Sequence, residues 1–333
     1  MNITTTDCAY GRSAVRTRRP LSSVLRWNTV TPRDRIDVSL VYGEETRRAI
    51  AAQPEWLAGV PTDRRFPDGA RLLFTGCGTS FHAAMTGGDA VPALELAMRP
   101  DREADLLVLV SHEGETPLTL EAARAWRGPR WLVTGQADGP IAELCDEVIV
   151  SAPEIEESWC HTASYTSAVA AIAALHGEDV SWLPGAVEDA LAAPLPASGE
   201  QERFLVAGAG RDLATAHEAV LKLREGAWVA AEAYETEQLL HGYLAAVDES
   251  VRAFVLEGEG LAGERGAAAA AALRELGCDV DLMPTRHPAV DIVPFQRLTV
   301  EIAESRGREP DRIRRHDPRW IAAASAAKAD NAS

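Results

Sequence analysis

The chain has 333 residues, enough for two domains of ordinary size or one large domain with an extensive core. Its hydrophobic fraction of 46% and charged fraction of 25% are typical of a soluble globular protein. The formal net charge of -17 at pH 7 argues against a nucleic-acid partner and against binding to an anionic membrane.

The five cysteines are dispersed, without a CxxC pair or a zinc-ligand spacing. Such a set favours reduced thiols, a cytoplasmic location and no metal site. No apolar run reaches the roughly 18 to 20 residues needed to span a membrane. Residues 1–20 carry several arginines but no apolar core, so we do not expect a secretory signal. We expect a flexible tail over residues 1–30.

Apolar runs alternate with helical patterns along the chain, which predicts an α/β fold with parallel sheets and crossover helices. The strands predicted in the first half are 71–76, 105–111, 130–135 and 147–152, and its predicted helices include 116–126 and 162–175. These strands are continuously apolar, as strands covered on both faces require.

A stretch rich in Pro, Ala and Gly at 191–201 predicts a domain boundary. We therefore expect one domain over 31–193, a second over 194–322 and a C-terminal tail over 323–333. The second half is predicted to repeat the plan of the first, with strands at 204–210, 251–258 and 278–284 and a helix from Asp212 to about Val229.

The segments GCGTS (76–80) and GAGRD (208–212) each follow the first strand of their half, which suggests an internal duplication. GAGRD lacks the last glycine of a dinucleotide-binding fingerprint. This argues against a nicotinamide cofactor, and we expect none of any kind.

Two strand-to-loop junctions, LLFTGCGTS (72–80) and LLVLVSHEGET (106–116), indicate a ligand site. Each places small hydroxyl-bearing residues beside free backbone N–H groups at the start of a helix, where anions bind. At the carboxyl ends of neighbouring parallel strands the two loops would share one crevice. We therefore expect a small, polar and phosphorylated ligand.

Residues 217–248 hold the candidate catalytic groups. Glu218, Lys222 and Glu225 are spaced so that they lie on one face of a helix. One interpretation is a buried glutamate whose raised pKa suits a general base. The other is a Glu218–Lys222 pair with Glu225 solvated at the helix end. His241, in LLHG, is a further candidate.

Five motifs in this order, GCGTS, S-x-x-GET, LKLRE, AEAY and the following HG, resemble those of the sugar isomerase (SIS) domain family. The resemblance covers roughly residues 40–320, and is strongest to the isomerase half of the glucosamine-6-phosphate synthases. It implies two flavodoxin-like, doubly wound parallel-sheet subdomains and a homodimer.

The resemblance also implies roles for individual residues. Glu225 would move a proton between C1 and C2 of an open-chain sugar. His241 would open the sugar ring, reaching the site from the partner subunit. The sugar phosphate would be held by Ser80, Ser111 and Thr116. The backbone of Gly78 and Thr79 would contribute to the same site.

The sequence departs from the family pattern in its catalytic set. No glutaminase domain precedes the sugar domain, so we do not expect a glutamine-dependent amidotransferase on its own. The family lysine that forms a Schiff base is missing, because the matching stretch (307–320) offers only arginines and His316, and an arginine cannot act as an amine nucleophile. In this the chain resembles the phosphosugar-amine deglycases.

Glu113 stands where the synthases have a second phosphate-binding serine, and a carboxylate beside a phosphate is unfavourable. Glu113 either turns outward, with His112 and Arg211 supplying positive charge, or binds sugar hydroxyls or an ammonium group of an unphosphorylated ligand.

A further substrate loop of the family is altered here, at Trp159, His161 and Thr162. The bulky side chains would reshape the sugar pocket, although core packing at a helix start is the alternative. The sequence thus predicts an isomerase, deaminase or deglycase acting on an amino sugar (phosphate) or a sugar–amine adduct. The alternative is a non-catalytic sensor that binds a sugar phosphate.

Overall fold

The computed structural model describes residues 42–327. The predicted N-terminal tail (1–30) and the last six residues (328–333) lie outside this range. Two sheets, in each of which all strands run parallel, form the framework and confirm the predicted α/β fold.

The first sheet has the order β2-β1-β3-β4-β5. Its strands are β1 (Leu72–Gly76), β2 (Ala90–Pro92), β3 (Leu106–Val110), β4 (Arg130–Thr134) and β5 (Glu147–Val150). Its helices are α2 (Thr79–Met85), α3 (Ala93–Met98) and α4 (Pro117–Ala125), with a 3-10 turn at Ala142–Leu144. The order reverses between β1 and β3, which puts a switch point there.

The second sheet has the order β7-β6-β8-β9, with the same reversal between β6 and β8. Its strands are β6 (Arg203–Gly208), β7 (Ala230–Glu235), β8 (Val251–Leu256) and β9 (Asp279–Met283). Its helices are α7 (Arg211–Gly226), α8 (Thr236–Leu240) and α9 (Leu261–Glu275), with a 3-10 turn at Tyr243–Ala246.

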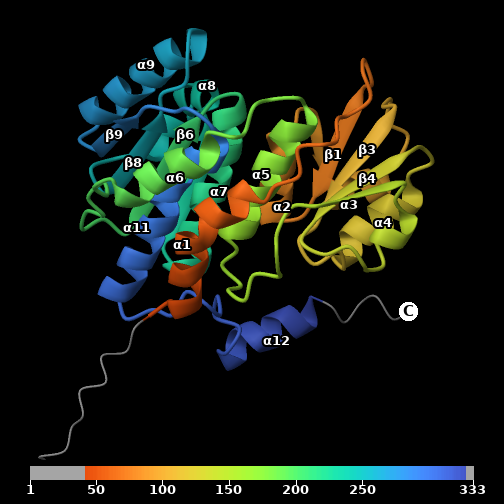
Figure 1. Cartoon of the computed structure of the whole chain (residues 1–333). Helices are drawn as coiled ribbons and strands as arrows, with labels where there is room; N and C mark the ends of the chain where they lie inside the picture. The colour runs from red at the N-terminus through yellow and green to blue at the C-terminus, as the bar shows by residue number, and fades with distance from the viewer. Residues whose placement is uncertain (1–41, 328–333) are drawn as a thin grey trace, which may run out of the picture. The chain divides into compact units, whose positions relative to one another are not determined.

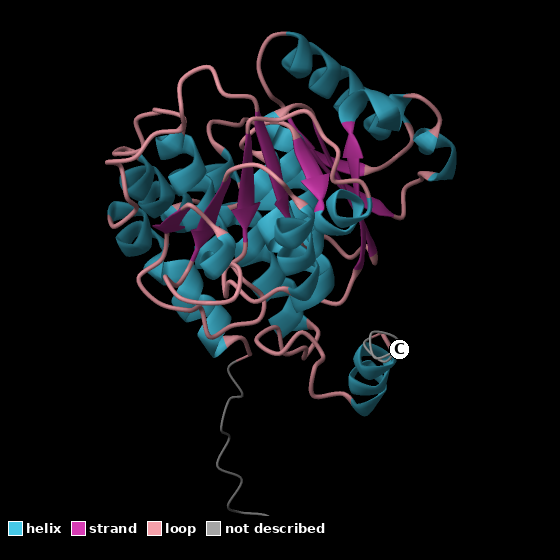
Figure 2. Ribbon diagram, turned by 90° about the vertical axis from the view of Figure 1, so that its right-hand side faces the viewer, coloured by secondary structure: helices cyan, strands magenta, loops and turns pink. Residues whose placement is uncertain are grey.

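The remaining helices are α1 (Glu44–Ala58), α5 (Ala163–Leu175), α6 (Leu183–Ala192), α10 (Pro288–Asp291), α11 (Val293–Ser305) and α12 (Pro318–Ala326). Figure 1 shows α1, α2, α5 and α7 between the two sheets, with α3 and α4 outside the first sheet and α9 outside the second. In Figure 2 the short helix α12, which has no buried residue, stands apart from the rest of the fold.

The strands bury both faces, which explains their continuous apolar sequences. Along β1 and β3, Phe74 and Val108 face the central helices, whereas Leu73 and Leu107 pack against α3 and α4. All residues of α5 are buried, since this helix lies in the central layer. The hydrophobic core is therefore shared by the two sheets.

Backbone geometry at three strand-to-helix junctions repeats closely. Gly78, Gly210 and Gly260, the residues before α2, α7 and α9, have φ of 56°, 60° and 55° and ψ of -131°, -129° and -126°. Positive φ favours glycine, because it has no Cβ. The repeated geometry and the repeated strand order agree with the predicted internal duplication.

All seven predicted strands are present, within two residues at each end. Two further strands were missed. Three-residue β2 is too short for a pattern, and β7 has the sequence AAEAYE, whose alanines and glutamates favour a helix. Helix α7 ends at Gly226, earlier than predicted, because Trp228 adopts a positive φ of 54° and turns the chain into β7.

Candidate functional site

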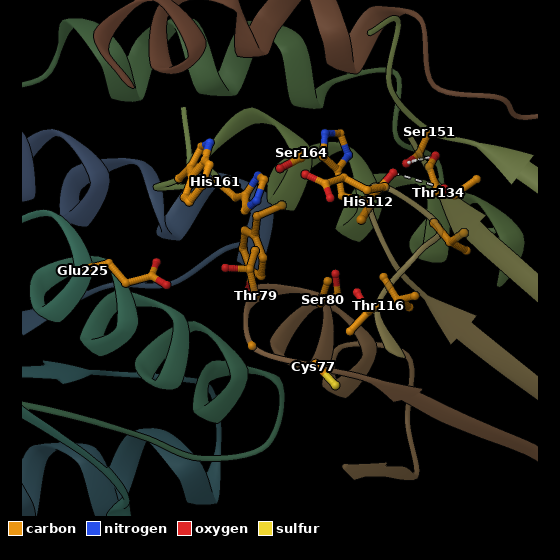
Figure 3. Close-up of a pocket in the computed structure, with 18 of the residues that line it drawn as sticks. Cys77, Thr79, Ser80, His112, Thr116, Thr134, Ser151, His161, Ser164 and Glu225 are labelled. Atoms are coloured by element: carbon orange, nitrogen blue, oxygen red, sulfur yellow. Dashed lines mark hydrogen bonds between the residues drawn. The ribbon is translucent and has the colours of Figure 1, made fainter. Parts of the chain in front are cut away.

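A cavity of about 440 Å³ lies at the carboxyl ends of β1 and β3, where ligands bind in open α/β sheets. Most of the residues predicted from the sequence line it: Gly78, Thr79, Ser80, His112, Glu113, Thr116, Trp159, His161 and Glu225. Figure 3 labels six of them, Thr79, Ser80, His112, Thr116, His161 and Glu225. Ser111, Thr162 and His241 do not.

The two predicted loops meet closely. A Cβ on Gly76 would lie 2.9 Å from the backbone of Ser80 and from the carbonyl oxygen of Val110, so only glycine allows this approach. Ser111 is buried, and its Oγ lies 3.2 Å from Oγ1 of Thr116. Ser111 thus supports Thr116 and does not itself face the cavity.

The hydroxyl of Thr79 is already committed inside the protein. Its Oγ1 donates to Oε1 of Glu218 at 3.1 Å and accepts from Nζ of Lys222 at 3.1 Å. Because the one hydroxyl hydrogen is used, Thr79 can offer a ligand only a lone pair. Its side chain suits a sugar hydroxyl better than a phosphate oxygen.

Glu218 and Lys222, one turn apart on α7, form a fully buried ion pair of 3.3 Å. His82 Nδ1 lies 2.7 Å from the other oxygen of Glu218. Burial alone would raise the pKa of Glu218, but Lys222 and His82 outweigh it, and the pKa lies below its usual value. Glu218 is therefore the paired carboxylate of the second interpretation above.

Glu225 differs from Glu218 because its side chain reaches the cavity. Nζ of Lys222 donates to its Oε2 at 2.9 Å, and 25% of the side chain is exposed. Figure 3 shows this side chain pointing from α7 toward Thr79. The expectation that Glu225 is solvated at a helix end does not describe it: Lys222 fixes one oxygen, and the carboxylate lines the cavity.

His112 and His161 lie together on the cavity wall, with ring centroids 5.4 Å apart. Burial, and for His161 also the charge of Lys222, lowers the pKa of each to about 4. His112 Nε2 accepts from the backbone N–H of Glu156 at 2.9 Å, which places the ring proton on Nδ1. His161 Nδ1 is buried and has no hydrogen-bond partner in the range 42–327.

Glu113 is exposed at the cavity. The structure does not support the expectation that His112 and Arg211 supply positive charge beside it. His112 is neutral at neutral pH and supplies no positive charge. Arg211 lies 3.3 Å from both Glu178 and His287 and does not line the cavity. Neither predicted cation therefore offsets a phosphate placed beside Glu113.

Thr162 has a structural position. Its backbone N–H and its hydroxyl both donate to Oε1 of the buried Glu156, at 2.7 and 2.9 Å, and Ser164 does the same to Oε2. Glu156 thus caps the N-terminus of α5, whose first N–H groups have no helical partner. The polar residues after Trp159 hold the loop in place.

His241 lies away from this cavity. Its side chain is 72% exposed and Nε2 lies 2.9 Å from Oε1 of Glu237, one turn earlier. Within one subunit it is not combined with Glu225.

Several polar residues of the cavity were not predicted: Cys77, Thr134, Ser151, Ser164 and Arg315. Thr134 ends β4 and Ser151 follows β5, so the rule that ligands bind at strand ends would have found them. Arg315 comes from the C-terminal segment, and no local pattern indicates it.

Between residues 42 and 327, no three His, Cys, Asp or Glu side chains gather as a metal site requires. No helix in that part of the chain is long and apolar enough to cross a membrane.

Comparison with known proteins gives relatives in sequence and in structure, although no protein-family model matches the chain. The glutamine–fructose-6-phosphate aminotransferase (isomerizing) of Thermus thermophilus is 30% identical, over 77% of this chain and 52% of its own length. The enzyme of the same name from Pyrobaculum aerophilum is 24% identical, over 73% of this chain and 50% of its own. The chain spans about half the length of these curated relatives.

Solved structures show which half is matched. The C-terminal domain of glucosamine-fructose-6-phosphate aminotransferase from Francisella tularensis superposes with a TM-score of 0.68 and 19% identity, covering 81% of this chain and 98% of that domain. The chain is a homologue of the isomerase half of these aminotransferases.

Two other structures share the fold of this isomerase-half homologue. Glucosamine-6-phosphate deaminase from Thermotoga maritima has a TM-score of 0.67 and 21% identity, covering 80% of this chain and 97% of that one. Tagatose-6-phosphate ketose/aldose isomerase from Escherichia coli has a TM-score of 0.66 and 17% identity, covering 81% and 95%. The fold is that of two SIS subdomains, as the motifs predict.

Proposed function

We propose that the chain is an SIS-type isomerase, deaminase or deglycase that acts on an amino sugar, its phosphate, or an adduct of a sugar and an amine. The observation that carries this proposal is the position of Glu225, whose carboxylate lines the same cavity as the polar loops after β1 and β3. The names of the relatives, an isomerizing aminotransferase, a deaminase and an isomerase, support the same class of chemistry.

Exchange of hydrogen between C1 and C2 requires one base that takes a proton from one carbon and returns it to the other. Oε2 of Glu225 is held by Lys222, whereas Oε1 makes no hydrogen bond within residues 42–327. Oε1 would remove the proton, the C–H electron pair would form the double bond between C1 and C2, and the carbonyl π pair would move to the carbonyl oxygen, giving an enediolate. That oxygen would take the proton of the neighbouring hydroxyl, which becomes the new carbonyl. The protonated Glu225 would then deliver the proton to the neighbouring carbon.

Ring opening requires a second group, and His241 is the candidate. Because it is exposed and remote from the cavity of its own chain, it would act in the cavity of a partner subunit. The proposed enzyme is therefore a homodimer with shared sites.

The polar walls suit a sugar with an amino group. Ser80 and Thr116 would bind the end of the ligand that carries a phosphate or a hydroxyl. Glu113, without a cation from His112 or Arg211, would accept hydrogen bonds from sugar hydroxyls or from an ammonium group.

The test follows hydrogen exchange and does not require the final product to be known. The protein is incubated in D2O with glucosamine, fructose and a fructosyl-amine, each with and without the 6-phosphate, and deuterium at C1 and C2 is measured by NMR. Glu225→Gln should abolish exchange while leaving binding by calorimetry nearly intact, because the charge is lost and the shape is kept. Glu275→Gln, an exposed change on α9, is the matched control. Exchange that persists at the wild-type rate in Glu225→Gln would refute the role of this residue.

A further inference from the structure

One cation, Arg315, lines the cavity from the C-terminal segment. Its guanidinium stacks on the indole of Trp159, 3.9 Å from the ring centroid. Of the described residues that line the cavity, only this one carries a full positive charge at neutral pH, since the two histidines are neutral. Two carboxylates, Glu113 and Glu225, also line the cavity. An anionic ligand would find its favourable charge at Arg315.

The stack is built into the fold. The backbone N–H of Trp159 donates to the carbonyl oxygen of Asp311 at 3.0 Å. The carboxylate of Asp311 accepts from the N–H groups of Glu45 and Thr46, at 3.0 and 2.8 Å, and so caps α1. Ser158 joins the same cluster, with its Oγ 2.7 Å from Oγ1 of Thr46. The loop that carries Trp159 and the segment that carries Arg315 are thus fixed to one point.

The chain turns sharply just before Arg315. Ile313 and Arg314 have φ of 40° and 62°, a region that L-residues rarely adopt and that is unfavourable for a β-branched residue. Ile313 itself lines the cavity, and the strained turn brings Arg315 to its mouth. Backbone strain of this kind clusters at functional sites.

The guanidinium is available for a ligand. Within residues 42–327 no carboxylate lies within 4.0 Å of it, and its nitrogens make no hydrogen bond in that range. Stacking on Trp159 fixes the plane of the group but leaves the N–H groups on its edge free. A planar guanidinium held in this way matches a carboxylate through two parallel hydrogen bonds.

The position of Arg315 indicates which part of the ligand it meets. In Figure 3, Ser80 and Thr116 lie on one side of the cavity, and Glu225 and His161 on the other. Arg315 lies on the side of His161, because it stacks on Trp159, two residues before His161 in the same loop. The base Glu225 must face C1 and C2, so a substituent on these carbons extends toward Arg315.

We propose that Arg315, stacked on Trp159, binds a carboxylate on the amine half of the ligand, so that the substrate is an adduct of a sugar with an amino acid. This inference rests on the proposed function and narrows its substrate class. The sugar end would occupy the loops after β1 and β3, and the amino-acid carboxylate would bind at the mouth of the cavity.

The test compares two probes that differ only in the carboxylate: fructosyl-glycine and fructosyl-glycinamide, each with and without the 6-phosphate. Affinities are measured by calorimetry on the full chain. The wild type should bind the carboxylate about 10-fold or more tightly than the amide. Arg315→Gln should bind the two equally, and Arg315→Lys should keep part of the preference, since the charge remains but the paired N–H geometry is lost.

Arg319→Gln is the matched control, because Arg319 also stacks on a tryptophan, Trp320, but does not line the cavity. It should keep the full preference. Equal affinities in the wild type, or an unchanged preference in Arg315→Gln, would overturn this inference and leave the proposed function standing. Binding of neither probe would also overturn this inference. The proposed function fails separately, if neither glucosamine, fructose nor the fructosyl-amine exchanges hydrogen in D2O, so the two failures are distinguishable.

Discussion

Lys222 donates a 2.9 Å hydrogen bond from Nζ to Oε2 of Glu225, three residues further along α7. The same ammonium pairs with the fully buried Glu218. The carboxylate that faces the cavity is therefore tied to an ion pair in the core, and the site depends on the stability of that pair.

Replacing Lys222 should destabilise the protein strongly. Lys222→Met leaves the carboxylate of Glu218 buried without its cation, which costs about 3–5 kcal/mol. Urea unfolding measures this loss. The double variant Glu218→Gln/Lys222→Met should recover much of it, because no uncompensated charge remains. A loss below about 1 kcal/mol in the single variant would contradict the pairing.

Glu156 and its neighbour Glu157 offer a matched pair. Glu156→Gln should lower the free energy of unfolding by about 1–3 kcal/mol. The backbone N–H groups of Thr162 and Ser164 now donate to the two carboxylate oxygens, and in the variant one of them would face an NH2 group, which is also a donor. Glu157, exposed and paired only with the exposed Arg48, should tolerate the same change within about 0.5 kcal/mol. Equal effects of the two substitutions would show that Glu156 does not cap α5.

Asp311 caps α1 from 265 positions away in the sequence. Asp311→Asn should destabilise the protein by about 1–2 kcal/mol. The two carboxylate oxygens accept one N–H group each, from Glu45 and Thr46, whereas the NH2 group of an asparagine can only donate, so one of these hydrogen bonds is lost. The control is Asp317→Asn at the start of α12, where Asp317 accepts from a single backbone N–H, that of Arg319, and an Asn oxygen can replace it. Thermal unfolding of the two variants should separate them, and a neutral Asp311→Asn would count against the cap.

Stability should fall as the pH falls from about 6.5 to about 4. His112, His161 and His287 have pKa values lowered to about 4, chiefly by burial, whereas unfolded histidines bind protons near 6.5. Each stabilises the folded state above pH 6.5, and this contribution is lost on acidification. Burial raises the pKa of Asp291 to about 7, so this carboxyl has the opposite effect on stability. Its contribution to the folded state is complete below pH 3.8 and is lost as the pH rises toward 7.

Three histidines against one carboxyl leave a net of two protons taken up on unfolding. These four groups together should therefore change the free energy of unfolding by at most about 3 kcal/mol per pH unit in this window, with stability rising as the pH rises. Urea titrations across the window give the slope. His161→Gln should reduce it by about 1.4 kcal/mol per pH unit, and an unchanged slope would mean that His161 titrates normally.

Mixing two inactive variants tests the proposed dimer. If Glu225 and His241 act in one site from different subunits, a heterodimer of Glu225→Gln and His241→Asn contains one intact site. Random exchange of equal amounts should then restore about a quarter of the wild-type activity. The control mixes each variant with itself, which should restore nothing. No recovery after verified subunit exchange would place both groups in the same chain.

The sequence by itself determined the α/β class, the strand positions and the loops of the site. Continuous apolar runs ending in small polar residues are a local signal, and parallel strands bring such ends to one edge. Ser80 and Thr116 could therefore be placed in one crevice from their positions alone. The strand β7 escaped prediction because its Ala and Glu residues favour a helix in isolation, and only pairing with β6 makes it a strand.

The tertiary structure decided which glutamate faces the cavity and where the positive charge lies. Glu218 and Glu225 occupy the same helical face, and only packing against α2 buries one and leaves the other at the cavity. Arg315 reaches the cavity because Asp311 binds the start of α1, a contact between opposite ends of the described chain. Periodicity records which residues share a face, but such contacts depend on how distant elements pack, which no local pattern contains.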